Sequence, residues 1–196
     1  MCIRDRIEML KTAFTMMGIE PIQCDGFEAD DIISHIVHHV KKPAEVLVVS
    51  PDKDLMQLVG NKTRIYNTRS KAFISAPEVQ RMTGLPPVLI PAFLAIMGDA
   101  ADNIHGVPGI GKTRAARALN AYGSLKQLLA GVKAKEPKKI PDKEAHAIDE
   151  HRILILQNLR LTRLKKSVPL KILPYKYPAS KMSPKKIDAA ISALVD

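Results

Sequence analysis

The segment Glu45-Val-Leu-Val-Val-Ser50 constrains the fold of this chain more than any other feature. Its uninterrupted apolar residues are typical of a strand buried on both faces, as strands of a parallel sheet are. Parallel strands need crossover connections, and amphipathic helical spacing from Glu28 to Val40 precedes this segment. The sequence therefore predicts an α/β core in which helices flank a twisted, mostly parallel sheet.

Other segments of the N-terminal half predict further helices and strands of this α/β core. Helical spacing predicts a helix at Ile7–Met17, and a short strand is expected at Glu20–Cys24. Pro51 predicts the start of a helix that runs to about Val59, since proline is favoured in a first helical turn. Lys62–Thr68 and Ala72–Ile74 predict two strands joined by a hairpin.

The pattern becomes helical from Ser75 onward. Ser75-Ala-Pro-Glu78 has the form of a capping box at a helix start. We expect three parts along the chain: an α/β core at 1–74, a helical region at 75–165 and a basic tail at 166–196. Further helices are expected at Val88–Met97, Lys112–Ala121, Ser124–Ala130 and Asp142–Leu156, with a last short helix at Ser183–Leu194.

The charge is unevenly distributed. Thirty Lys and Arg face twenty Asp and Glu, for a net charge of +10, and seven of the acids fall in three tight groups. A basic surface with a concentrated acidic site suits a polyanion held over a divalent cation, although composition alone leaves open a basic protein without such a role. Aromatic residues make up only 4%, which argues against binding nucleic acid mainly by base stacking. The three acidic groups are Glu28, Asp30 and Asp31; Asp52 and Asp54; Asp99 and Asp102.

Each acidic group lies where an apolar element ends. Asp52 and Asp54 follow the predicted strand at its carboxyl end, where open parallel sheets place their ligands. Oxygen ligands suit Mg²⁺ or Mn²⁺, and two such ions can activate water and stabilise the leaving oxygen of a phosphodiester. Acids in a first helical turn are also favoured by the helix dipole, so a structural explanation of Glu28 and Asp30 remains open.

The segment Gly106-Val-Pro-Gly-Ile-Gly-Lys-Thr113 matches the P-loop pattern G-x-x-x-x-G-K-[ST]. A P-loop follows a buried strand, whereas a polar, turn-like segment precedes this one. Pro108 also lacks the backbone N–H that a phosphate cradle needs at that place. We therefore expect a glycine hairpin that offers backbone N–H groups to a DNA phosphate, reinforced by Lys112, Arg114 and Arg117.

Four segments together resemble the successive motifs of the 5′-nuclease family. This family includes the 5′–3′ exonuclease domain of DNA polymerase I, phage-type 5′ exonucleases and flap endonucleases. The resemblance covers Ile7 to Leu164, and four motifs in order are far more specific than any one of them. The motifs are Gly26-Phe-Glu-Ala-Asp-Asp31, Ser50-Pro-Asp-Lys-Asp-Leu55, Met97-Gly-Asp-Ala-Ala-Asp-Asn103 and Gly106–Thr113.

The resemblance implies a fold, a metal centre and a DNA site. The expected fold is a twisted sheet flanked by helices, followed by a helix–hairpin–helix module. By family analogy, a first metal ion is held or oriented by Glu28, Asp30, Asp31 and Asp52, and a second by Asp54, Asp99 and Asp102. The expected catalytic residues are Asp30, Asp52, Asp54, Asp99 and Asp102. The expected DNA-binding residues are Gly106, Val107, Gly109, Ile110, Gly111, Lys112, Thr113, Arg114 and Arg117, with a K⁺ ion at the hairpin in relatives.

The resemblance also implies a function, although the N-terminus of this chain differs from the family pattern. Family members begin with an apolar strand that bears a metal-binding Asp, and Met1–Arg6 does not match it, so we expect an N-terminally truncated chain. The implied activity is that of a divalent-metal-dependent 5′–3′ exonuclease or flap endonuclease, acting as a cytoplasmic, nucleoid-associated monomer on DNA in replication and repair. The alternatives are a catalytically impaired DNA-binding fragment and a P-loop nucleotide hydrolase.

Overall fold

A computed structural model describes residues 3–40, 45–134 and 139–170. The chain forms two compact units, which we treat separately: the terminal unit, residues 1–32 with 168–196, and the main unit, residues 33–167. The division falls inside helix α2 (Ala29–His39). The tail and the helix expected at Ser183–Leu194 lie almost entirely outside the described residues.

The terminal unit contains helix α1 (Ile3–Met16). This helix ends at Gly18, which has the left-handed φ of 78° and donates its N–H to the Thr15 carbonyl at 2.9 Å. The strand expected at Glu20–Cys24 is wrong, because these residues are irregular and pair with no strand in the described part of the chain. A short apolar run gives a weak signal, and a strand needs a partner to satisfy its backbone.

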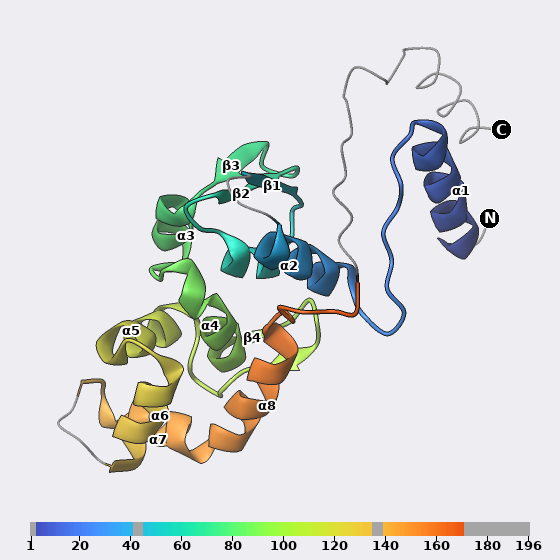
Figure 1. Cartoon of the computed structure of the whole chain (residues 1–196). Helices are drawn as coiled ribbons and strands as arrows, with labels where there is room; N and C mark the ends of the chain where they lie inside the picture. Colours follow the sequence, from blue (N-terminus) through green and yellow to red (C-terminus); the bar gives the residue numbers. More distant parts are fainter. Residues whose placement is uncertain (1–2, 41–44, 135–138, 171–196) are drawn as a thin grey trace. The chain divides into compact units, whose positions relative to one another are not determined.

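The main unit contains a three-stranded mixed sheet (Figure 1). Strand β1 (Val46–Val49) pairs in parallel with β2 (Thr63–Asn67), and β2 pairs antiparallel with β3 (Ala72–Ile74). The β2–β3 hairpin is therefore confirmed, whereas the described sheet has one parallel and one antiparallel pairing rather than being mostly parallel. Only Val48 of β1 is buried, so the expectation of burial on both faces of this strand is wrong in the described structure.

Helices make up the rest of the main unit. The capping box at Ser75 is confirmed: the backbone N–H of Ser75 donates to Glu78 Oε2 at 3.1 Å. The single helix expected at Asp142–Leu156 is two helices, which break at His151 so that each packs on a different neighbour. The elements are η1 (Asp54–Leu58), α3 (Ala76–Thr83), η2 (Pro87–Leu89), α4 (Ile90–Met97), β4 (Gly98–Asp99), β5 (Ile104–His105), α5 (Lys112–Tyr122), α6 (Leu125–Ala134), α7 (Asp142–Glu150) and α8 (Arg152–Thr162), where η marks a 3₁₀-helix.

No single helix in the described ranges has the length and apolar composition needed to cross a membrane. Helix α3 and the segment Pro87–Met97 have that length and apolar composition only when they are counted together, and they are bent by 53° relative to each other.

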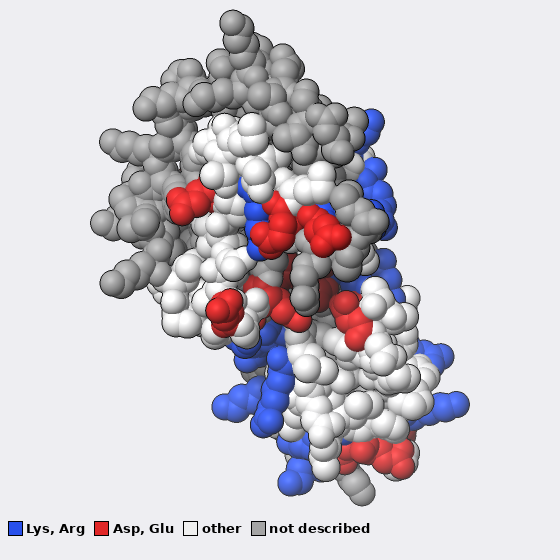
Figure 2. Space-filling model, turned by 90° about the vertical axis from the view of Figure 1, so that its right-hand side faces the viewer, with Lys and Arg blue, Asp and Glu red and all other residues white. Residues whose placement is uncertain are grey.

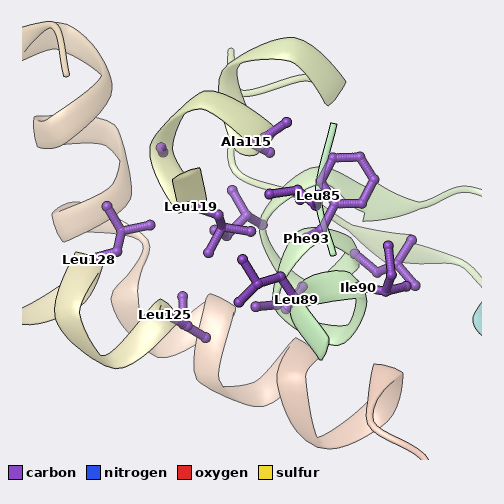
Figure 3. Packing of buried hydrophobic residues seen from close by; sticks show 14 of the residues in the cluster. Leu85, Leu89, Ile90, Phe93, Ala115, Leu119, Leu125 and Leu128 are labelled. Atoms are coloured by element: carbon purple, nitrogen blue, oxygen red, sulfur yellow. The ribbon is translucent and has the colours of Figure 1, made fainter. Parts of the chain in front are cut away.

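Helix α4 is the centre of the helical part. All its residues from Ile90 to Ile96 are buried, and it lies between α5 and α8 (Figure 1). Figure 3 shows the hydrophobic cluster around α4. Its labelled side chains are Leu85, Leu89, Ile90 and Phe93, which pack with Ala115 and Leu119 of α5 and with Leu125 and Leu128 of α6. Burying each large aliphatic or aromatic side chain contributes about 1.5–3 kcal/mol, so this cluster positions the segments at both ends of α4.

Two polar side chains of helix α8 bond it to the core. Asn158 Nδ2 donates to the carbonyls of Ala95, at 3.0 Å, and His105, at 2.8 Å. Thr162 Oγ1 donates to the Pro91 carbonyl at 2.9 Å. Helix α8 is thereby bonded to both sides of the β4–β5 turn.

Gln57 of η1 bonds to the end of the same helix. Its Nε2 donates to the Thr162 carbonyl at 2.9 Å, and its Oε1 accepts the Leu164 N–H at 3.2 Å. One helix therefore positions both η1 and the β4–β5 turn.

Two glycines allow the β4–β5 ribbon to form against the end of α4. Gly98 has φ 82°, and a Cβ added there would overlap the Gly106 backbone. A Cβ at Gly106 would overlap the carbonyl of Met97. The two backbones approach too closely for any side chain at either position.

We predict that Asn158→Ala lowers the free energy of unfolding by about 2–3 kcal/mol, because the buried Ala95 carbonyl and the part-buried His105 carbonyl lose their donor. Asn120→Ala is the matched control: Asn120 Nδ2 donates to the Gly84 carbonyl at the surface, and its loss should cost at most about 1 kcal/mol. Urea unfolding of both variants measures the difference. Equal losses would contradict the anchoring role of Asn158.

Candidate metal centre and glycine hairpin

Three carboxylates converge in the main unit. Oxygen atoms of Asp54, Asp99 and Asp102 all lie within 4.8 Å of one another. Asp54 is the first residue of η1, Asp99 ends β4, and Asp102 lies in the turn between β4 and β5. Residues 45 positions apart in the sequence thus meet at one point.

A side-chain turn after β1 positions Asp54. The Asp52 N–H donates to Ser50 Oγ at 3.1 Å, and Asp52 Oδ1 accepts the Asp54 N–H at 2.9 Å. These bonds compete with helical ones, and for that reason the helix expected from Pro51 begins only at Asp54 and is a 3₁₀-helix. Asp52 is exposed beside the cluster.

The β4–β5 turn positions the other two carboxylates. Asp99 is buried, and its Oδ1 accepts the Ala101 N–H at 3.0 Å. Asn103 has a φ of 56°, a left-handed conformation that Asn tolerates better than most residues. The turn leaves Asp102 exposed at the rim of the cluster.

Burial and the neighbouring negative charges disfavour the charged form of Asp54. Burial first, and then the negative charges of Asp52, Asp99 and Asp102, raise the pKa of Asp54 to about 7, against the opposing effect of Lys53. Burial lowers the pKa of Lys53, but its hydrogen bond to Asp99 and the surrounding carboxylates more than offset this, so the pKa lies above its ordinary value. Lys53 Nζ lies 2.6 Å from Asp99 Oδ1.

Two buried oxygens of the cluster have no hydrogen-bond partner, namely Asp54 Oδ1 and Asp99 Oδ2. An unsatisfied buried acceptor is costly, and a cation removes that cost. A set of carboxylate oxygens is the donor set that hard divalent cations prefer. The residues present therefore fit a divalent metal ion.

The first acidic group lies in a different unit. Asp30 and Asp31 are in the first turn of α2, and the Glu28 carbonyl accepts the Ile32 N–H there at 3.2 Å. These residues belong to the terminal unit, so the expectation that Glu28, Asp30 and Asp31 share a site with Asp52 and the cluster stays a prediction.

The glycine hairpin follows β5 directly. Val107 to Ile110 form a tight turn in which the Ile110 N–H donates to the Val107 carbonyl at 3.0 Å and Gly109 has φ 77°. This is the geometry that a Pro-Gly pair favours in a type II turn. A two-residue antiparallel strand precedes it instead of a buried parallel one, which disfavours a P-loop.

The hairpin leads into the N-terminus of α5. Gly111 is the N-cap residue and offers no side chain to bond the first N–H groups of the helix. Val107 and Ile110 are buried and fix the turn, while Lys112 and Thr113 are exposed. A surface concavity is lined by Val107, Gly109, Ile110, Gly111, Lys112, Thr113 and Arg114.

Two of the predicted DNA-binding arginines have partners inside the protein. Arg114 donates to the Gly109 carbonyl at 2.6 Å, and its Nε lies 3.5 Å from Glu144 Oε1. Arg117 forms an ion pair with the same Glu144 oxygen. Glu144 is buried at 6% exposure, so Arg114 links the hairpin to α7 and Arg117 links α5 to α7, in addition to any role at the surface.

Sequence reasoning missed Lys53 and Glu144. Lys53 lies between two predicted ligands in the segment Asp52-Lys-Asp54, so its proximity to the metal centre could have been noted. Glu144 lies in a later helix, with no pattern to link it to the hairpin 30 residues earlier. On the face that Figure 2 shows, Lys and Arg side chains project from the lower part of the molecule, where Figure 1 shows α5, α6 and α7, and an acidic patch lies among them.

Two family models match nearly the entire chain. Residues 2–84 match the 5′–3′ exonuclease N-terminal resolvase-like domain, and residues 85–185 match the 5′–3′ exonuclease C-terminal SAM fold. Their common boundary lies between α3 and α4.

Similar curated proteins are named DNA polymerase I or 5′–3′ exonuclease. DNA polymerase I of Rhizobium leguminosarum is 36% identical over 82% of this chain and 15% of its own length. The 5′–3′ exonuclease of Buchnera aphidicola is 31% identical over 88% of this chain and 60% of its own length. The chain thus spans less than two thirds of these curated relatives.

Solved structures share the fold. The phage T5 5′-exonuclease with bound zinc superposes with a TM-score of 0.65 at 21% identity, over 90% of this chain and 62% of that one. The T5 flap endonuclease in complex with DNA and metal ions gives 0.68 at 20% identity, over 98% and 67%. The catalytic core of Rad2 with DNA substrate gives 0.60 at 14% identity, over 97% and 63%.

The fold and the two family models, together with relatives more than 30% identical, lead to one assignment: this chain belongs to the 5′–3′ exonuclease family.

Proposed function

We propose that this chain is a nuclease that hydrolyses DNA phosphodiesters at 5′ ends or 5′ flaps with the help of Mg²⁺ or Mn²⁺. The observation that carries the proposal is the convergence of Asp54, Asp99 and Asp102 around two buried oxygens without hydrogen-bond partners. We further propose, from the resemblance alone, that it acts as a cytoplasmic monomer.

Asp54, Asp99 and Asp102 would hold one divalent ion, with Asp52 beside them to orient Asp54 through its backbone N–H. When bound, such ions polarise the phosphodiester, lower the pKa of the attacking water and stabilise the leaving oxygen. By the resemblance alone, a first ion is proposed to be held or oriented by Glu28, Asp30, Asp31 and Asp52. No side chain in the described cluster needs to act as a general base.

The hairpin would hold the duplex next to this centre. It follows the Asp99–Asp102 turn after only a few residues, so a phosphate bound there is held at a fixed distance from the carboxylates. Backbone N–H groups at the start of α5 and the Lys112 side chain suit a phosphate, and such contacts position DNA without reading its sequence. K⁺ at the hairpin carbonyls stays a prediction by resemblance.

A DNA-binding protein without cleavage is the second candidate. The observation that favours it is that the hairpin, with Lys112 and Thr113 exposed at the start of α5, suits a phosphate whether or not a metal ion is bound. The third alternative, a P-loop hydrolase, is disfavoured by the strand that precedes the hairpin.

We predict that Asp54→Asn lowers cleavage of a 5′-labelled flap substrate in Mg²⁺ or Mn²⁺ by on the order of a hundredfold or more, since metal catalysis is worth several kcal/mol. Binding of the same DNA in Ca²⁺, measured by gel shift, should persist. Asp149→Asn removes an exposed carboxylate of α7 and should leave cleavage unchanged. Binding by the unmodified protein with no cleavage would favour the second candidate.

We predict that raising the pH from 5 to 8 destabilises the metal-free protein through Asp54. The pKa of this carboxyl is about 7 in the folded state and 3.8 ordinarily, so within that window the folded state holds a proton that the unfolded state lacks. The stabilising contribution is complete below about pH 4 and lost as pH rises through 7. Urea unfolding in EDTA should therefore show Asp54→Asn gaining stability over the parent protein as pH rises. A gain independent of pH, or an equal gain for Asp149→Asn, would contradict this.

We predict that Lys112→Ala mainly weakens DNA binding, whereas Arg117→Ala mainly destabilises the fold. Lys112→Ala should weaken DNA binding several-fold and reduce the salt slope by about 1, with unfolding changed by less than about 0.5 kcal/mol. Arg117→Ala should destabilise the fold by about 1–3 kcal/mol, because buried Glu144 loses a charged partner. Gel shifts at several salt concentrations and urea unfolding measure both effects, with Lys133→Ala as the exposed control. A pure binding defect in Arg117→Ala would contradict the structural role.

A further inference from the structure

Lys53 is the one cation in the described residues that bonds directly to the carboxylate cluster. Its Nζ lies 2.6 Å from Asp99 Oδ1, and the Asp99 side chain is only 1% exposed. The Lys53 side chain itself is 44% exposed. The buried partner is therefore fixed, whereas the lysine reaches it from the solvent side on a long, flexible stem.

In the metal-free protein, this contact offsets the repulsion among the carboxylates and the cost of burying the charge of Asp99. Three carboxylates lie within 4.8 Å of one another, and one of them is buried. Like charges at this distance repel strongly in a low-dielectric site, and a buried charge without a partner is unstable. The Lys53 ammonium supplies the single positive charge that keeps Asp99 paired.

The same contact opposes a divalent ion. Asp99 Oδ1 already accepts from Lys53 and from the Ala101 N–H, so an ion that uses this oxygen has to replace a donor. Even an ion that uses only the free Oδ2 would lie within a few ångströms of the ammonium charge. Repulsion between like charges at such distances is large enough to change affinity by about tenfold.

We propose that Lys53 is a resident counter-ion of the metal centre: it pairs with Asp99 when no divalent ion is bound and yields that carboxylate when one binds. This inference rests on the proposed metal centre. Lys53 is then a positioning residue that keeps the carboxylates together before a divalent ion binds. It also makes the affinity of the centre for that ion lower than the carboxylates alone would give.

Mn²⁺ titration of the full chain by calorimetry tests the proposal. Lys53→Met should bind Mn²⁺ about tenfold more tightly than the parent protein and should melt at a lower temperature in EDTA, and the difference in melting should disappear at saturating Mn²⁺. Lys53→Arg keeps the charge and should stay within about twofold of the parent affinity. Lys62→Met is the matched control, because Lys62 is an exposed lysine whose loss changes the net charge equally.

A second measurement uses the unmodified protein, so it does not depend on a variant that folds. Pulse acetylation at constant pH, followed by mass spectrometry of the Lys53 peptide, should show several-fold faster labelling of Lys53 when Mn²⁺ is bound. The labelling of Lys62 should not change.

The outcomes separate the two proposals. If the parent protein binds no Mn²⁺, or if Asp54→Asn binds it as tightly as the parent, the metal centre itself is wrong. If the parent binds Mn²⁺ but Lys53→Met binds it equally or more weakly, or if Mn²⁺ leaves the labelling of Lys53 unchanged, the counter-ion role is wrong and the metal centre stands.

Discussion

The attachment of helix α8 to helix α4 determines where the functional groups lie. Asn158 and Thr162 bond to backbone carbonyls on α4 and on β5, and Gln57 bonds the end of α8 to η1. The two segments that bring carboxylates to the cluster come from distant parts of the chain and are both attached to this one helix. A carboxylate centre tolerates little displacement, since ligand oxygens off by an ångström no longer share an ion. The helical half therefore serves as the rigid support of a site whose first ligand lies next to the sheet.

The carboxylate cluster and the arginines near the hairpin each pair with a residue of the opposite sign. Lys53 lies among carboxylates, and Glu144 lies beneath the arginines of the hairpin. In both places the buried partner is a carboxylate, and the cation reaches it from the surface. This arrangement keeps a strongly acidic site and a basic surface close together within one unit without leaving a buried charge unpaired. It also means that the count of basic residues overstates the positive charge that the hairpin presents.

Sequence patterns predicted elements whose signal is local. The capping box at Ser75, the β2–β3 hairpin and the glycine hairpin that starts at Gly106 depend on a few adjacent residues, and the structure has them all. The errors arose where distant or side-chain interactions decide. Glu20–Cys24 has no strand partner in the described structure, Asp52 replaces the first helical turn with its own hydrogen bond, and the helix expected at Asp142–Leu156 breaks to follow two neighbours. For the site, the sequence predicted that Asp54, Asp99 and Asp102 each lie close to the end of an apolar helix or strand. It could not predict that they converge, or that Arg114 and Arg117 pair with Glu144, because both depend on how distant segments pack.

The contact between Gly98 and Gly106 has a consequence for anyone who wishes to alter this protein. Because each position lies against the backbone of the other, a methyl group at one cannot be accommodated by trimming the other, which is already the smallest residue. Random libraries built on this scaffold should therefore lose nearly every clone in which either codon changes, whatever property is selected. Keeping both codons fixed would concentrate the diversity on the exposed residues of the hairpin and of the turn after Asp99, where new substrate preferences can arise without loss of the fold.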